Sequence, residues 1–136
     1  MKKTLESPKV AKTKGPYVQG VAVSDGTLIY TSGVVARDAR GKIRGIGDIR
    51  VQTRQCLANI RHIIEAGGGR LTDLVKVTVF LRDLRDYEGM NEVRREVLAD
   101  VAFASSTVQA QLNAAGALVE IEAQAFVSPA IQGVRK

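Results

Sequence analysis

Two glutamates near the end of the chain, Glu120 and Glu122, are the residues whose type and spacing best suit acid–base chemistry. They lie in an alternating polar and apolar run, Leu118 to Val127, which predicts a strand. Residues two apart on a strand point to the same side, so the carboxylates are expected about 7 Å apart on one face. One interpretation is a solvated or salt-bridged sheet face opposite Lys76. The other is a general base at a subunit interface, where partial burial raises the pKa of the carboxyl.

A second polar segment, residues 103–110, reads FASSTVQA and has no basic residue, although the chain carries 20 Lys and Arg. Its alternation predicts a strand over residues 105–112, with Ser105 and Thr107 on one side and Ser106 on the other. This row of small hydroxyl side chains is a candidate set of hydrogen-bond donors to a ligand.

Metal and thiol chemistry have little support. The chain has one His and one Cys, and its carboxylates show no ligand spacing, so a structural zinc site is excluded. His62 falls on the outward side of a predicted helix, which favours a surface residue. Cys56 falls on the apolar side of the same helix, which favours a small core residue over a nucleophile. We therefore expect no metal site.

Length and composition predict one domain spanning residues 1–136. A hydrophobic fraction of 45% is ordinary for a globular protein, and no apolar run approaches the roughly 20 residues of a membrane span. The basic N-terminus has no apolar stretch behind it, so it does not resemble a secretory signal. The single cysteine fits a reducing compartment. These features predict a cytoplasmic protein without membrane contact.

The formal charge of +6 raises the possibility of nucleic-acid binding. The basic residues are scattered along the chain, however, and only three Phe and three Tyr are available to stack on bases. The pattern favours a solvated basic surface, so nucleic acid is not an expected partner.

Hydrophobic periodicity predicts seven elements in the order β-β-α-β-α-β-β. A tight hairpin at Asp25-Gly26 is expected to join the first two strands, and Asp48 is expected to cap the first helix. On the second helix Met90 and Val93 are placed inward, and Arg94 and Arg95 outward. The predicted strands cover residues 18–23, 28–32, 75–81, 105–112 and 118–127, and the predicted helices cover residues 48–66 and 86–100.

This order predicts an α+β domain in which one mixed sheet carries two helices on one face. The other face of the sheet is left open, and its apolar area favours burial in an oligomer. Residues 1–14 are expected to form a loose N-terminal segment, and residues 128–136 a C-terminal tail.

Four ordered motifs together resemble the RidA/YjgF family of small reactive-intermediate deaminases, which older descriptions call translation inhibitors or endoribonucleases. The resemblance extends from Gly15 to Val127, which is nearly the whole chain. Its motifs are GPYVQGV at 15–21, IYTSG at 29–33, VKVTVFLRDLRDYEGMN at 75–91 and VEIEA at 119–123.

This resemblance implies a chorismate-mutase-like fold assembled as a homotrimer, with ligand-binding clefts between subunits. It implies hydrolysis of imines and enamines to 2-oxo acids and ammonia without a cofactor. Carried over residue by residue, the resemblance places Tyr17, Ser32, Gly33 and Asn91 along the cleft. It gives Glu120 the task of positioning the attacking water.

The resemblance breaks at the position where the family carries its substrate-binding arginine, because this chain has Ser105 there. Thr107 stands where cysteine is common, and the connection from Asn91 to Ser105 is shorter than usual. A charge-assisted arginine–carboxylate interaction is worth roughly 1.5–3 kcal/mol, so its loss predicts about tenfold to hundredfold weaker binding of small imino acids. Three rescues are open: a substrate without a carboxylate there, Arg82 or Arg94 reaching in from a neighbour, or loss of deamination.

The leading hypothesis is a cofactor-independent hydrolase or deaminase of an imine, enamine or related nitrogen-containing metabolite, with an altered substrate preference and weak or absent activity on 2-iminobutanoate. Glu120 is the expected acid–base residue, and Ser105, Ser106 and Thr107 are expected to donate hydrogen bonds to the ligand. The alternative is a trimer that binds a small ligand or regulates without catalysis. RNA binding or cleavage follows only from the older descriptions, and no residue pair offers an obvious acid and base for it.

Overall fold

A four-stranded mixed sheet organises the molecule, and the computed structural model describes residues 1–129 of the 136. The strand order is β3-β6-β4-β5, with β6 antiparallel to both of its neighbours and β4 parallel to β5. The strands are β3 (Thr27–Tyr30), β4 (Leu74–Leu81), β5 (Ala104–Gln109) and β6 (Val119–Val127). The predicted α+β fold with a mixed sheet is confirmed.

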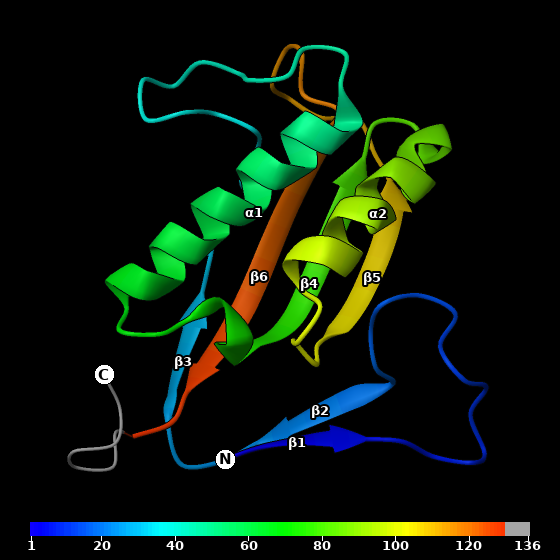
Figure 1. The fold of residues 1–136 in the computed structure, drawn as a ribbon, viewed down its shortest axis with the longest axis vertical. Coiled ribbons are helices and arrows are strands. Elements are labelled where there is room, and N and C mark those ends of the chain that lie inside the picture. Colours follow the sequence, from blue (N-terminus) through cyan, green and yellow to red (C-terminus); the bar gives the residue numbers. More distant parts are fainter. Residues whose placement is uncertain (130–136) are drawn as a thin grey trace.

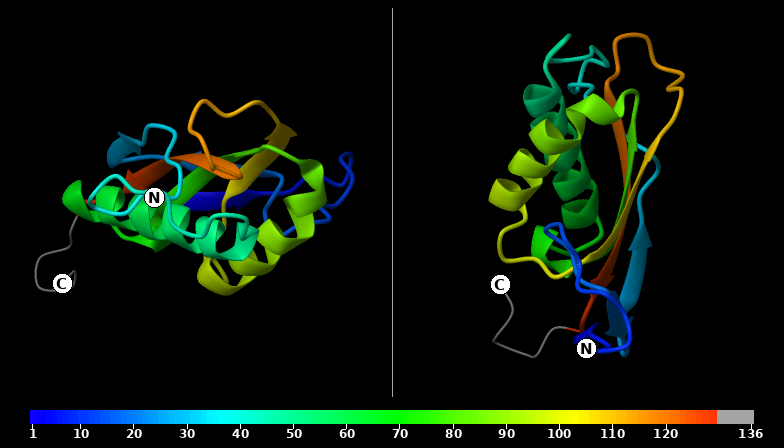
Figure 2. Two further views of the ribbon diagram at one scale, coloured as in Figure 1. Left: turned by 90° about the horizontal axis from the view of Figure 1, so that it is seen from above. Right: turned by 90° about the vertical axis from the view of Figure 1, so that its right-hand side faces the viewer.

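Two helices, α1 (Ile49–Ala66) and α2 (Tyr87–Val97), cover one face of this sheet, and the opposite face carries no helix in the described residues (Figures 1 and 2). Helix α1 begins as predicted, because the Asp48 side chain accepts hydrogen bonds from the backbone N–H groups of Arg50 and Val51. Helix α2 forms the crossover that parallel neighbours require, from the end of β4 to the start of β5. Short 3-10 turns precede β4 and α2, at Leu71–Asp73 and Leu84–Asp86.

The core lies between the helices and the sheet. Val77, Val79 and Leu81 of β4 have no exposed surface and alternate with half-buried residues that face away from the helices. Helix α1 contributes Cys56 and Ile60, both fully buried. From Lys76 onward, this alternation assigns the residues of β4 to either the helix-covered face or the open face.

The structure corrects the prediction for Arg94, which is fully buried rather than outward-facing; Arg95 is exposed as expected. Arg94 follows Met90 by four residues and stands next to Val93, so it lies on the same side of α2 as these two buried residues. The prediction was wrong because it assigned the residue by polarity rather than by helical spacing.

The N-terminal region also differs from the prediction. Residues 2–5 form β1 (Lys2–Leu5), which pairs antiparallel with β2 (Gly20–Val23) in a separate two-stranded sheet. The chain does turn at Asp25, which has a positive φ of 58°, but β2 and β3 do not pair as a hairpin. Instead β3 is hydrogen-bonded to β6 along its length, so the edge of β2 is available to β1. Of the predicted tail at 128–136, residues 130–136 lie outside the described residues.

Candidate functional site

The carboxylate of Glu120 lies against Gly33, on the open face of the sheet. Glu120 is half-buried and stands opposite Phe80 of β4. The segment after β3 is fixed beside it by two backbone hydrogen bonds between Val34 and Ile121, of 2.8 and 2.9 Å. A Cβ added at Gly33 would lie 2.5 Å from Glu120 Oε2. The glycine therefore leaves the space that this side chain occupies, and the exposed Ser32 directly precedes it.

Replacing Gly33 by Ala is expected to leave the fold intact and to displace the Glu120 carboxylate. The atoms that the new methyl group meets belong to the flexible end of a side chain, so they can move at little cost to stability. We expect kcat of a reaction that uses this carboxylate to fall by about tenfold or more, since a small misplacement of a catalytic group costs up to roughly 100-fold. Steady-state kinetics and a urea unfolding curve measure the two effects. An unchanged kcat in a normally stable variant would show that Glu120 does not depend on this contact.

Glu122 has a different environment from Glu120. It is exposed, and it stands opposite Thr78 rather than Lys76, which is in register with Gln124. The Lys76 ammonium instead donates to the Ser106 hydroxyl at 3.5 Å. Neither Glu120 nor Glu122 forms an ion pair with any residue between 1 and 129. The salt-bridged interpretation of this face therefore finds no support in the described residues.

On the opposite, helix-covered face, a guanidinium lies beside Ser105. Arg94 Nη1 donates to Ser105 Oγ at 2.7 Å. Arg94 Nε and Nη2 both donate to Asn91 Oδ1, at 3.1 and 2.7 Å. The Phe103 ring lies 5.7 Å from the Arg94 Cζ atom, within the range of a cation–π contact. Strand β5 and helix α2 thus bring two predicted residues, Asn91 and Ser105, together around an arginine that the sequence analysis had placed outside.

Burial lowers the pKa of Arg94 to about 10, so the side chain still carries its positive charge at neutral pH. Arg82, the other arginine considered as a rescue, is engaged elsewhere. Its guanidinium donates to the backbone carbonyls of Leu112, Ala114 and Ala117 and so anchors the loop between β5 and β6. Only Arg94 of these two arginines contacts Ser105, and it does so within one chain rather than from a neighbour.

The three predicted hydroxyl residues fall on two faces of β5. Ser105 and Thr107 are in register with the inward Val77 and Val79, whereas Ser106 is in register with Thr78 on the open face. The predicted site is therefore divided in a single chain. Asn91, Ser105 and Thr107 belong to the helix-covered face; Gly33, Ser106 and Glu120 belong to the open face or its margin.

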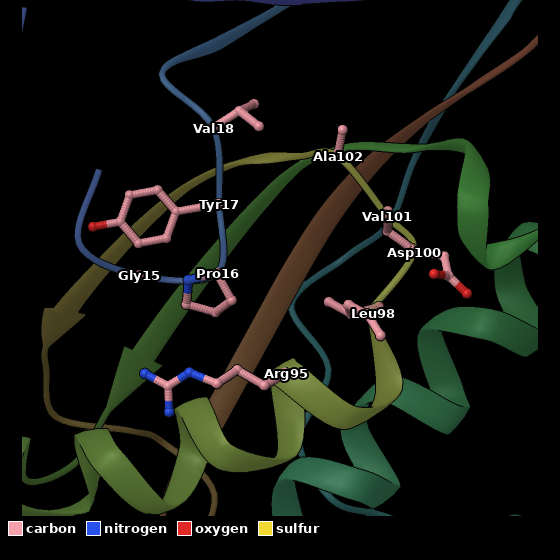
Figure 3. Close-up of a pocket in the computed structure, with 10 residues that line it drawn as sticks. Gly15, Pro16, Tyr17, Val18, Arg95, Leu98, Asp100, Val101 and Ala102 are labelled. Carbon is pink, nitrogen blue, oxygen red and sulfur yellow. The ribbon is translucent and has the colours of Figure 1, made fainter. Parts of the chain in front are cut away.

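Tyr17 lies close enough to Arg94 to interact with it electrostatically. It is half-buried, packs against the hydrophobic core, and lines a cavity of about 640 Å³ between residues 15–18 and the C-terminal end of α2. Figure 3 shows Tyr17 on one wall of this cavity and Arg95 on another. A second cavity, of about 600 Å³, lies between α1 and the segment after β3, and Gly33 is part of its lining. Neither of these two cavities includes Ser105 or Glu120.

Metal and thiol chemistry find no site in the described residues. No group of three His, Cys, Asp or Glu side chains there is arranged to hold a metal ion. Cys56 is fully buried, and burial, followed by the nearby charge of Glu120, raises its pKa to about 12, so its thiol is not a nucleophile at neutral pH. The His62 side chain is 66% exposed, as expected for a surface residue. None of the described helices has the length and apolar character needed to span a membrane.

Comparison with known proteins places these features in a family context. Residues 7–127 match the family model described as endoribonuclease L-PSP. A RutC family protein of Pyrococcus horikoshii is 37% identical over 126 residues, which cover 93% of this chain and 98% of that protein. A 2-iminobutanoate/2-iminopropanoate deaminase of Dermatophagoides farinae is 33% identical over 121 residues, which cover 89% of this chain and 93% of that protein.

A solved structure shows the same fold. The crystal structure of Escherichia coli TdcF with bound serine matches with a TM-score of 0.70 and 33% sequence identity, over 93% of this chain and 98% of that one. The similarity extends over both the helix-covered face and the open face described above, since it includes nearly all of both chains.

Proposed function

Because the chain belongs to the RidA/YjgF family, whose sequence model is described as endoribonuclease L-PSP, we propose that it hydrolyses a small imine or enamine without a cofactor. The observation that carries this proposal is the Glu120 carboxylate against Gly33, a half-buried base with room for its side chain on a sheet face. The relative named as a 2-iminobutanoate/2-iminopropanoate deaminase supports the reaction class.

The site is proposed to form between copies of the chain, as a homotrimer. Glu120 and Gly33 on one side and Ser105 and Asn91 on the other lie on opposite faces of one sheet, so one small ligand does not touch both sets in a single copy. A neighbour that packs its open face near strand β5, an edge strand, brings a second Glu120 toward the Ser105 side. This arrangement also covers the half-exposed apolar residues of the open face, such as Phe80 and Val108.

The proposed reaction needs one base and one water molecule. Glu120 accepts a proton from the water as its oxygen attacks the imine carbon, which gives a carbinolamine. The same carboxyl group then returns the proton to the nitrogen and carries the hydroxyl proton to it as well, so that the carbon–nitrogen bond breaks as the carbonyl forms, and a 2-oxo acid and ammonia leave. An enamine enters the same sequence after its carbon is protonated. Hydrogen-bond donors around Ser105 hold the remainder of the substrate.

We propose that substrate preference differs from that of relatives with an arginine at position 105, because the serine there leaves a differently shaped wall. A ligand-binding trimer without catalysis is the second candidate, and the division of the predicted residues between two faces is equally compatible with it. RNA cleavage rests only on the older descriptions of the family.

The test is a panel of imines generated in situ by an amino-acid oxidase from 2-aminobutanoate, leucine and phenylalanine, with product formation followed for this protein and for the Dermatophagoides relative. We expect accelerated hydrolysis of at least one imine and a different order of kcat/KM between the two proteins. If the protein forms a trimer and binds one of these imines but accelerates the hydrolysis of none, the non-catalytic candidate would be established. An identical order of substrates would contradict the altered preference.

A further inference from the structure

A buried positive charge without a negative partner lies at the centre of the Asn91–Ser105 cluster. Arg94 has no exposed surface, and no carboxylate between residues 1 and 129 lies within 4.0 Å of its guanidinium. Its hydrogen-bond acceptors, the Asn91 amide and the Ser105 hydroxyl, are both neutral. Buried charges in proteins are normally paired, so this arrangement is incomplete unless an anion binds there.

The guanidinium retains the donors that such an anion needs. Three of its five N–H groups are used, two by Asn91 and one by Ser105. The other two, one on Nη1 and one on Nη2, have no acceptor among the described residues. A carboxylate bonded to both terminal nitrogens forms a bidentate, charge-assisted pair. Because Ser105 Oγ accepts from Arg94, its own hydroxyl proton is free to donate to the same carboxylate.

We infer that Arg94 anchors the substrate carboxylate and that the guanidinium comes from helix α2 instead of strand β5. The inference rests on the proposed function and names the substrate class of that site, which is a small imine or enamine with one carboxylate. The small side chain of Ser105 then leaves space for this guanidinium, since a long side chain at position 105 would compete with it for the same space. Asn91 and Phe103 hold the guanidinium in place from its other sides.

Access to Arg94 is from the Ser105 end, where the contact between the two side chains is only partly buried. The segment that carries Tyr17 is attached to the start of β5 by a hydrogen bond from Val18 N to the Phe103 carbonyl, at 2.9 Å. Tyr17 is close enough for its electrostatic interaction to act on Arg94. Tyr17 and Ser105 therefore lie on the side from which a ligand is proposed to reach Arg94.

The experiment compares two ligands that differ only in charge. Dissociation constants for 2-oxobutanoate, the product of 2-iminobutanoate hydrolysis, and for its amide are measured by calorimetry alongside kcat and KM for the imine. We expect Arg94→Met to weaken 2-oxobutanoate binding by about tenfold to hundredfold and to change the affinity for the amide less than about threefold. Arg94→Lys keeps the positive charge but not the planar guanidinium that binds a carboxylate through two nitrogens, so an intermediate loss of 2-oxobutanoate affinity is expected. Arg61→Met removes an exposed charge from α1 and serves as the matched control.

An exchange variant separates ligand binding from a structural role. Arg94→Met combined with Ser105→Arg places the guanidinium on strand β5. We expect this double variant to recover at least half of the 2-oxobutanoate affinity that Arg94→Met loses, measured on the scale of log Kd. Ser105→Arg alone places two guanidinium groups together, so it is expected to be less stable than the exchange variant. Equal losses for 2-oxobutanoate and the amide in variants with normal circular dichroism would overturn the inference. If Arg94→Met does not fold, Arg94→Lys decides by the same comparison of the two ligands.

The outcomes distinguish this inference from the proposed function. If the native protein hydrolyses imines and Arg94→Met has an unchanged KM, Arg94 does not bind the substrate carboxylate, and the proposed function is retained. Charge-selective binding that depends on Arg94, without hydrolysis of any imine, supports the anchor and rejects the proposed function. Absence of 2-oxobutanoate binding to the native protein rejects the anchor.

Discussion

Glu120→Gln is expected to lower kcat for imine hydrolysis by about 10²–10⁴-fold, the range associated with loss of a general acid–base group. The amide has nearly the same shape as the carboxylate, so it can remain against Gly33, but it cannot accept the proton of the attacking water. KM is expected to change little, because the substrate carboxylate is proposed to bind on the other side of the site. Single-turnover kinetics with the oxidase-generated imine measure the effect on chemistry directly.

Glu122→Gln provides a matched control two residues away on the same face of β6. Glu122 is exposed and stands opposite Thr78, so its substitution is expected to leave kcat within about twofold. Equal losses in the two variants would indicate that the charge of the face, rather than a specific base, supports the reaction. A native kcat in Glu120→Gln would remove this residue from the mechanism.

Ile60→Ala is expected to have the largest effect on stability, with a loss of about 2–5 kcal/mol in the free energy of unfolding. Ile60 is fully buried on the side of α1 that faces the sheet, so truncation leaves a cavity in the core. Alanine is a good helix former, so the loss is not due to helix propensity. The urea midpoint should fall with little change in the m-value, measured at one protein concentration because the proposed self-association would also stabilise the fold.

Ile63→Ala on the same helix is the control, since Ile63 is 37% exposed and is expected to lose about 1 kcal/mol or less. Similar midpoints for the two variants would mean that α1 contributes little to the core. A normal imine-hydrolysing activity of Ile60→Ala below its unfolding transition is expected, because Ile60 is not one of the proposed site residues.

Local patterns were sufficient for the central elements. The alternation of Val77, Val79 and Leu81 predicted β4, and the capping residue Asp48 set the start of α1, because both signals depend on neighbours a few residues away in the chain. The same local alternation separated Ser105 from Ser106 on β5. It did not reveal which face each residue would share with Glu120, since that depends on the partners of the strand.

Arg94 marks the limit of the sequence-based prediction for the site. Its position three residues after Asn91 and four after Met90 was a usable signal, because such residues share one side of a helix. The polarity of arginine argued for the surface, and only the contact with Ser105, 11 residues away across the α2–β5 connection, shows where the guanidinium lies. Ser105, which in the sequence suggested the loss of a substrate-binding arginine, contacts the buried Arg94 in the folded chain.

The sequence by itself determined the family, the α+β fold and the identity of Glu120, Gly33 and Asn91 as candidate residues, because motif order and short-range periodicity are written along the chain. The tertiary structure decided the pairing of β1 with β2, the burial of Arg94 and the division of the candidate residues between two sheet faces. These features depend on contacts between residues far apart in sequence, where several partners compete and packing selects among them.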